Sequence, residues 1–269
     1  MLTEERELFS LKEKDVYFFD LDGTIYLGNK LFDGILKLID TLKNNEEKRF
    51  FFLSNNSSKS TSDYLKKLTT LGLDITLDNI ILSQHPTIDY LKKEGYKDVF
   101  LLGNKSLKEE FLGEGFNLTE ENPEILVLAF DQELTYEKLV KAGYLLQDGI
   151  PYIATHLDNR CPTEKGYIPD AGGIAALLQR TADRMPRVFG KPNKDMLLFK
   201  LNNLNIAPEK AVMFGDRLYT DIKMGLNAGV TTCSVLSGET SLSMIQESET
   251  KPDYIINGVW ELIPIFEDL

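Results

Sequence analysis

Cysteine and histidine are scarce in this chain, whose 269 residues include only two of each. Cys161 and Cys233 are too few for a disulfide framework, and they lack the paired spacing that zinc knuckles require. We therefore expect both thiols to be small, buried, apolar side chains.

Long apolar stretches are also missing. No run approaches the roughly 20 apolar residues that span a bilayer. The first residues, MLTEERELFSLKEKD, carry too much charge for a signal peptide. We therefore expect a cytoplasmic protein.

Positive charge is in deficit, because 30 Lys and Arg face 42 Asp and Glu, giving a formal net charge of −12. This balance argues against nucleic acid as a partner, since phosphate backbones need a basic footprint. It also argues against anionic membranes. An anionic phosphate substrate would need local positive charge from a metal, a lysine or oriented backbone amides.

The first part of the chain reads as alternating strands and helices. Apolar runs at Asp15–Asp20 and Arg49–Leu53 predict buried parallel strands. Helical spacing predicts helices at Asp33–Asn45, with Asp33 as the N-cap, and at Thr61–Leu71. This order describes a right-handed parallel unit, whose ligands bind beyond the C-terminal ends of the strands.

The same order returns late in the chain, with a strand at Ala211–Phe214, a helix at Tyr219–Ala228 and a strand at Thr231–Leu236. The two ends therefore read as halves of one sheet. The stretch between them predicts an inserted α/β domain, giving core residues 1–81, an insertion at 82–184 and core residues 185–269. Its strand and helix candidates are Val99–Leu102, Asn104–Leu112, Ile125–Ala129, Thr135–Gln147 and Tyr152–Ala154.

Asp20 and Asp22 end the first predicted strand. Residues i and i+2 point to the same face, so both carboxylates could lie beyond the sheet edge, and Gly23 lets the backbone turn there. Close carboxylates repel unless a cation or a proton separates them, and Mg²⁺ suits a site of few carboxylates. Taken alone, the motif is more often a solvated turn.

Three other segments carry complementary groups at comparable positions. Ser54 and Asn55 follow the second strand, where a hydroxyl and amides could receive phosphate oxygens. Lys191 lies in a turn before a helical run from Asp195, and Asp216 and Asp221 follow the Ala211–Phe214 strand. A capping loop, a surface lysine and an N-cap would explain each separately. One shared site explains all of them together.

The runs DLDGTIY, SNNS, FGKP and GDRLYTDI, in this order, resemble the four motifs of the haloacid dehalogenase (HAD) superfamily, in particular its NagD-like phosphatases. The resemblance covers essentially the whole chain. It implies a Rossmann-like parallel-sheet core of the HAD type with an inserted α/β cap of the C2 type. It also implies a Mg²⁺-dependent phosphatase that forms an aspartyl phosphate.

Position by position, the resemblance makes Asp20 the nucleophile and Asp22 the acid and base. Mg²⁺ would be held by a carboxylate oxygen of Asp20, the backbone carbonyl of Asp22 and the carboxylate of Asp216. Asp221 would hold the second coordination layer or the lysine. Ser54 and Lys191 would bind the transferring phosphoryl group, assisted by Asn55 and the amides around Gly23.

The cap departs from the family at two places. Relatives often carry Thr-Asn-Pro-Asp where this chain has Thr155-His156-Leu157-Asp158, and Pro-Gly-x-Gly where it has Pro169-Asp170-Ala171-Gly172. His156, Asp158, Arg160 and Asp170 are therefore candidate specificity residues, although a cap-core histidine or a solvated loop would also explain them.

The predicted substrate is a small phosphate monoester, such as a sugar phosphate, a nucleoside monophosphate or a phosphoglycolate-like compound. Two alternatives stay open: a phosphoaspartate signalling receiver, and a catalytically silent sensor of phosphometabolites. Caps of this type can mediate dimers, so the resemblance also leaves a homodimer open.

Overall fold

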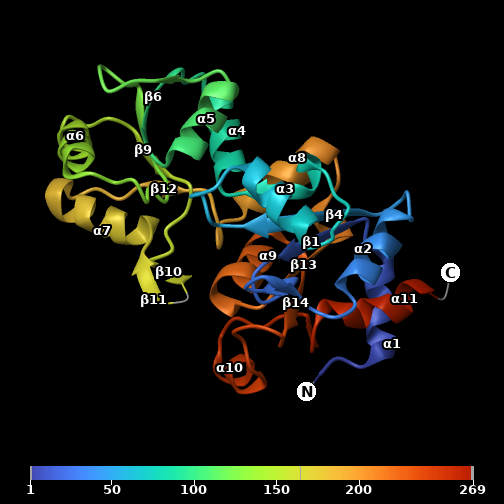
Figure 1. The fold of residues 1–269 in the computed structure, drawn as a ribbon. Coiled ribbons are helices and arrows are strands. Elements are labelled where there is room, and N and C mark those ends of the chain that lie inside the picture. Colours follow the sequence, from blue (N-terminus) through green and yellow to red (C-terminus); the bar gives the residue numbers. More distant parts are fainter. Residues whose placement is uncertain (1, 164, 268–269) are drawn as a thin grey trace. The chain divides into compact units, whose positions relative to one another are not determined.

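The computed structural model describes residues 2–163 and 165–267, which form two compact units. The first unit contains the residues up to Ser54, the segment Thr61–Ile81 and the residues from Lys191 onward. The second contains Asn55–Ser60 and Leu82–Gly190. Figure 1 shows the ribbon coloured by residue number, so that the segments of each unit can be followed.

The first unit is built on a six-stranded sheet in the order β15-β14-β13-β1-β4-β5. The pairs from β15 to β4 are all parallel, so the C-terminal ends of these strands share one edge. The strands are β1 (Val16–Asp20), β4 (Arg49–Ser54), β5 (Ile80–Leu82), β13 (Ala211–Gly215), β14 (Thr231–Val235) and β15 (Tyr254–Ile256).

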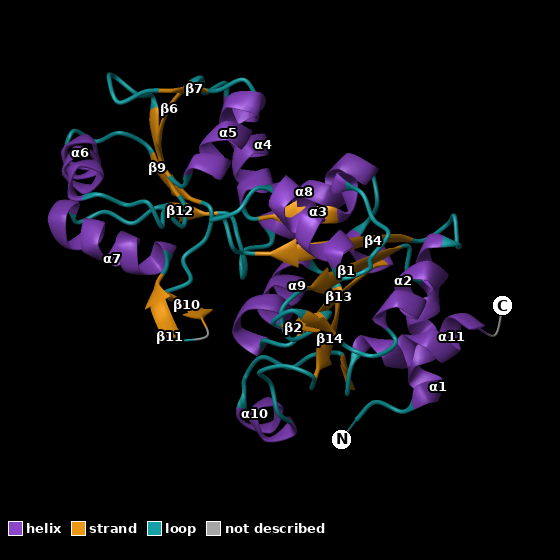
Figure 2. Ribbon diagram, in the orientation of Figure 1, coloured by secondary structure: helices purple, strands orange, loops and turns teal. Residues whose placement is uncertain are grey.

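Helices cover both faces of this sheet, as Figure 2 shows. Val16 and Phe18 of β1 pack into an apolar core with α8 and α9. Tyr17 points to the opposite face, where its ring meets Phe266 of α11 edge-on at 5.6 Å. The helices of the unit are α1 (Glu5–Leu8), α2 (Ile35–Lys43), α3 (Thr61–Thr70), α8 (Asp195–Leu204), α9 (Lys223–Ala228), α10 (Leu242–Glu247) and α11 (Ile263–Glu267).

Short elements complete the first unit. A small antiparallel hairpin, β2 (Tyr26–Leu27) with β3 (Lys30–Leu31), follows β1 directly. The short helical turns are η1 (Phe9–Glu13), η2 (Leu77–Asn79), η3 (Pro208–Lys210), η4 (Leu218–Ile222) and η5 (Val259–Leu262). Of these, η4 is π-helical and runs into α9.

The second unit has its own parallel sheet in the order β12-β9-β8-β6-β7. Helices α4 and α5 pack on one face of it, and α6 and α7 on the other. An antiparallel hairpin stands apart from this sheet. The elements are β6 (Asp98–Leu102), β7 (Asn117–Leu118), β8 (Ile125–Leu128), β9 (Tyr152–Ala154), β12 (Arg187–Val188), the hairpin strands β10 (Arg160–Thr163) and β11 (Gly166–Pro169), α4 (Gln84–Glu94), α5 (Lys105–Gly113), α6 (Tyr136–Gln147) and α7 (Ala171–Ala182).

The long segment of the second unit begins at Leu82, the predicted start of the insertion, but it does not end at the predicted residue 184. The second unit continues to Gly190 because β12 pairs with β9. It also takes in Asn55–Ser60, whose Ser58 carbonyl accepts a hydrogen bond of 3.0 Å from Asn104. Neither the pairing of β12 with β9 nor the hydrogen bond from Asn104 to Ser58 can be recognised from the amino-acid composition near the boundary.

Two local predictions are wrong. Asp33 does not cap α2; Gly34 occupies the N-cap with φ 87°, and a β-carbon there would lie 3.0 Å from the Trp260 β-carbon. Cys161 is only half-buried, whereas Cys233 is buried as expected. Among the described residues, no helix combines the length and apolar character needed to cross a membrane.

Candidate active site

The predicted site residues of the first unit come from the C-terminal ends of neighbouring strands. Asp20 is the last residue of β1, Ser54 is the last residue of β4, and Asp216 follows β13 directly. The strand order places β1 between β13 and β4. In a parallel sheet these ends meet at one edge, which is where ligands of such sheets bind.

Lys191 joins two of the carboxylates. Its ammonium contacts Asp20 Oδ1 and lies 2.8 Å from Asp221 Oδ1. The lysine side chain is only 4% exposed, and the Asp20 side chain 14%. Burial favours the contacts between Lys191 and these two carboxyl groups, because little water is available to replace them.

Asp216 completes a cluster of three carboxylates. Ligand oxygens of Asp20, Asp216 and Asp221 all lie within 4.8 Å of one another. The backbone N–H of Glu239 donates to Asp216 Oδ2 at 2.8 Å, but the buried Asp216 Oδ1 has no hydrogen-bond partner among the described residues. An orphaned buried carboxylate oxygen marks a position where a cation or a donor from a ligand fits.

Two carboxyl groups of this cluster, Asp20 and Asp216, have raised pKa values. Burial, with the charges of Asp221 and Asp216 adding to it and Lys191 opposing, raises the pKa of Asp20 to about 8. Burial and the charge of Asp221 raise the pKa of Asp216 to about 6. One ammonium therefore does not neutralise three carboxylates, and a further positive charge would lower both pKa values.

Asp221 lies in the π-helical turn η4, where a regular helix was expected. The Arg217 carbonyl accepts hydrogen bonds from the Asp221 N–H at 3.0 Å and the Ile222 N–H at 3.2 Å. A β-carbon on Gly215 would lie 2.2 Å from the Asp221 β-carbon, so the strand end has room only for glycine. π-helical turns are often found at functional sites, and this one carries a lysine partner.

Asp22 and Gly23 form the turn between β1 and the β2–β3 hairpin. Gly23 has φ 91°, and a β-carbon there would lie 2.3 Å from Asp216 Oδ2. The Gly23 N–H donates to the Tyr26 carbonyl at 2.8 Å. Partial burial raises the pKa of Asp22, and the charges of Lys67 and Arg217 oppose that rise. Its carboxylate is not part of the cluster of three.

Ser54 and Asn55 fall in different units. Asp20 is in register with Leu53 of β4, so Ser54 lies one residue beyond the level of Asp20. The Ser54 hydroxyl is 3.0 Å from the Tyr64 hydroxyl of α3. Asn55 belongs to the second unit, where its side-chain amide donates to Asp158 Oδ1 at 3.1 Å and its carbonyl accepts from Ser83 Oγ at 2.6 Å.

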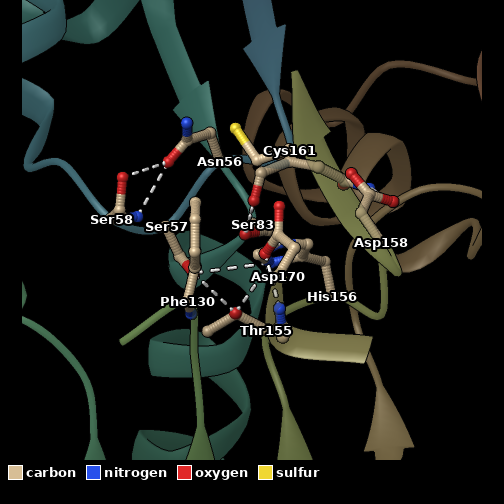
Figure 3. A network of polar contacts seen from close by, with 12 residues as sticks. Asn56, Ser57, Ser58, Ser83, Phe130, Thr155, His156, Asp158, Cys161 and Asp170 are labelled. Carbon is tan, nitrogen blue, oxygen red and sulfur yellow. Dashed lines mark hydrogen bonds and ion pairs between the residues drawn. The ribbon is translucent and has the colours of Figure 1, made fainter. Parts of the chain in front are cut away.

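In the second unit, His156 is the centre of a buried polar network (Figure 3). The ring is fully buried; its Nε2 lies 2.9 Å from Asp170 Oδ1 and its Nδ1 lies 3.1 Å from Thr155 Oγ1. Ser57 Oγ accepts from Thr155 Oγ1 at 3.0 Å and from the Phe130 N–H at 2.9 Å. These partners satisfy both ring nitrogens, as a structural histidine requires.

The four candidate specificity residues therefore differ in accessibility. Asp170 is buried and caps α7, accepting the Ala171 N–H at 2.6 Å. Asp158 is half-buried, and Arg160 is exposed with its guanidinium over the Tyr167 ring at 4.2 Å. Only Asp158 and Arg160 offer polar atoms that reach the surface of the unit.

Two family models match the chain. One, described as haloacid dehalogenase-like hydrolase, covers residues 17–117, and the other, described as HAD-hydrolase-like, covers residues 188–262. An acid sugar phosphatase of Staphylococcus epidermidis is 30% identical over 246 residues, which are 91% of this chain and 95% of the relative. The chain belongs to the haloacid dehalogenase-like hydrolases.

Solved structures of this hydrolase family agree with the fold. A 4-nitrophenylphosphatase of Thermotoga maritima is 41% identical, with a TM-score of 0.90 and coverage of 94% of this chain and 98% of the other. A glycerol phosphate phosphatase of Mycobacterium tuberculosis, in complex with magnesium, is 25% identical, with a TM-score of 0.86 and coverage of 97% and 78%. The similar structures also include NagD of Escherichia coli. The predicted NagD-like phosphatase class and α/β fold are confirmed.

Sequence reasoning missed one loop of this HAD hydrolase. Ser237–Thr240 follows β14, so it lies at the same sheet edge as the three other strand ends. The Glu239 N–H binds Asp216, and Ser237 Oγ donates to the Gly23 carbonyl at 2.7 Å. A β-carbon on Gly238 would lie 2.1 Å from Asp216 Oδ2. The available signal was a Ser-Gly pair at a strand end.

Proposed function

We propose that the protein is a Mg²⁺-dependent phosphatase that hydrolyses phosphate monoesters of small metabolites through a phosphorylated Asp20. The observation that carries the proposal is the buried cluster at the sheet edge. One lysine bridges Asp20 and Asp221, while an oxygen of the neighbouring Asp216 has no partner within residues 2–163 and 165–267. This combination suits an anionic substrate that arrives together with a cation.

The donor set fits magnesium. Three carboxylates whose oxygens lie within 4.8 Å of one another, one of them with an oxygen that has no partner among the described residues, match a small hard dication. We assign Mg²⁺ to a carboxylate oxygen of Asp20, the Asp22 carbonyl and the Asp216 carboxylate, with Asp221 holding Lys191. When bound, the ion supplies positive charge to the phosphate oxygens and to the carboxylates around it.

Asp20 is the proposed nucleophile. Its carboxylate attacks phosphorus, the bond from phosphorus to the ester oxygen breaks, and the leaving oxygen takes a proton from Asp22. Asp22 then accepts a proton from the water that hydrolyses the aspartyl phosphate. The raised pKa of Asp22 favours the protonated form that the first step needs.

The phosphate-binding assignments are Ser54, Lys191, Asn55 and the amides around Gly23. Lys191 is already held at the nucleophile, so its charge meets the phosphoryl group without rearrangement of the side chain. An acidic chain that binds an anion needs local positive charge or hydrogen-bond donors at the binding site. Lys191 supplies the charge, and the other groups supply the donors.

For the substrate, the relatives suggest small organic phosphates. We propose that residues of the second unit determine which of these substrates is preferred. Asp158 and Arg160 are the stronger candidates for this role, because His156 and Asp170 are buried. We also propose that the second unit acts as the cap predicted from the sequence. The homodimer and the cytoplasmic location stay predictions.

Hydrolysis of 4-nitrophenyl phosphate with Mg²⁺, and with excess chelator instead, tests this proposal. We expect activity only with the metal, and full activity in chelator would refute the metal assignment. A phosphate-release screen of metabolite monoesters, ranked by kcat/KM, then identifies the preferred substrate class. No release from any ester would favour the receiver or the silent sensor.

A further inference from the structure

Two side chains of α3 contact segments that carry proposed active-site residues. Tyr64, which is 6% exposed, places its hydroxyl 3.0 Å from the Ser54 hydroxyl. A serine hydroxyl rotates freely unless a neighbour fixes it. If Tyr64 donates this hydrogen bond, the serine hydrogen is directed to another acceptor, which in the proposed reaction is a phosphate oxygen.

Lys67 lies one helical turn after Tyr64 on the same helix. Its ammonium sits over the ring of Tyr26, 3.8 Å from the ring centroid. Tyr26 is buried, and its main chain closes the catalytic turn: its carbonyl accepts the Gly23 N–H, and its N–H donates to the Leu21 carbonyl at 3.2 Å. Lys67 thus holds the residue that fixes the turn carrying Asp22 and Gly23.

We propose that Tyr64 and Lys67 are positioning residues of the phosphatase reaction, Tyr64 for the Ser54 hydroxyl and Lys67 for the Asp22–Gly23 turn. The inference rests on the proposed function. Residues three apart on a helix share one face, so a single helix reaches both the last residue of β4 and the first residue of β2. A mispositioned catalytic group lowers the rate even when the fold is intact.

A double-mutant cycle tests the Tyr64 role. Tyr64→Phe removes only the hydroxyl, and we expect kcat/KM to fall about 3- to 10-fold, mostly in kcat, which is the range of one hydrogen bond. In a Ser54→Ala background, the same change should have no further effect, because the group that Tyr64 orients is absent.

Tyr254→Phe is the matched control. Tyr254 is the first residue of β15, and its hydroxyl lies 2.8 Å from Ser10 Oγ of η1, so kcat/KM should stay at the wild-type value. An equal loss from Tyr64→Phe with and without Ser54, or no loss at all, would overturn the Tyr64 role. An inactive wild-type protein would instead contradict the proposed function.

A charge replacement tests the Lys67 role. Lys67→Met keeps the aliphatic stem and loses the cation, and we expect kcat to fall about 2- to 5-fold. Lys67→Arg should restore most of it, since a guanidinium also binds an aromatic face. Equal activity of the Met and Arg variants, whether high or low, would show that the cation over Tyr26 does not matter.

Discussion

Two clusters of potential metal ligands, one in each unit, contain similar groups at similar spacing. Asp20, Asp216 and Asp221 form the first, and His156, Asp158 and Asp170 form the second, each within 4.8 Å. In the first, one ammonium contacts two of the three carboxylates, and an oxygen of the third has no partner among the described residues. In the second, the His156 ring contacts Asp170 and the Thr155 hydroxyl. Asp158 accepts a hydrogen bond from the Asn55 side-chain amide.

The difference shows that ligand type and spacing do not by themselves identify a metal site. Protein groups already make hydrogen bonds to His156, Asp158 and Asp170 in the second cluster, so a cation would have to displace those bonds. The first cluster has too few donors for its acceptors, and that shortage is what a cation relieves. Substitutions should therefore affect chemistry in the first cluster and stability in the second.

The largest expected effect comes from Asp20→Asn. The amide has the same shape but is not a nucleophile, so kcat/KM for 4-nitrophenyl phosphate should fall at least about 1,000-fold. The control is Asp74→Asn, which alters an exposed carboxylate paired with Lys43 and should leave kcat/KM unchanged. Activity of Asp20→Asn near the wild-type value would contradict the role of Asp20 as the nucleophile, and with it the proposed chemical role of the first cluster.

Asp22→Asn should cost about 100-fold or more with alkyl phosphates, in line with the loss of a general acid. An aryl phosphate has a better leaving group and needs the proton less, so the loss should be smaller. The measurement is kcat/KM on both ester types. Equal losses would rule out proton donation to the leaving oxygen.

Without metal, the first cluster should make stability depend on pH. Folding raises the pKa of Asp216 to about 6 and of Asp20 to about 8, above the value of about 3.9 for an unfolded aspartate. The folded state then binds more protons, so the stabilisation is complete below the unfolded pKa and is lost as pH rises through about 6 to 8. In chelator, Tm should fall over this range.

Magnesium should reverse this trend, because it binds the deprotonated carboxylates and raises Tm more at the alkaline end. Asp20→Asn in chelator should flatten the dependence, since one titrating group is gone. Thermal melts across pH measure both effects. A Tm in chelator that rises steadily from about pH 5 to pH 8 would contradict the raised pKa values.

The smallest effect is expected from His156→Phe in the second cluster. It leaves buried oxygens of Asp170 and Thr155 short of a partner, at a cost of about 1–3 kcal/mol in the free energy of unfolding. His85→Phe is the control, because that ring is 20% exposed and should cost less. Urea unfolding measures both, and an equal or larger loss for His85→Phe would contradict the structural role of His156.

The sequence predicted that candidate site residues lie at the ends of neighbouring strands, and the structure places them there. Asp20, Ser54 and Asp216 end apolar runs, and parallel strands bring such ends together whatever the loops do. Lys191 lies 171 residues from Asp20, so their contact followed from the family resemblance and not from local pattern.

Other features depend on tertiary packing and could not be predicted locally. Gly34, rather than Asp33, is the N-cap of α2, where the backbone has φ 87° and approaches the Trp260 side chain closely. Asp221 lies in a π-helical turn that packs closely against Gly215 of β13. The hydroxyl pair of Tyr64 and Ser54 joins a helix to a strand, and nothing in the helical pattern of α3 indicates it.

The most direct test of the account is to trap the intermediate. The enzyme is mixed with Mg²⁺ and substrate, quenched in acid within the first turnovers and digested, and the phosphorylated peptide is identified by mass spectrometry. We predict phosphorylation of Asp20 that disappears as substrate is exhausted and never appears in Asp20→Asn. Rapid turnover with no phosphorylated peptide, or with the phosphoryl group on another residue, would contradict the account, and a long-lived phosphoaspartate without turnover would favour the receiver.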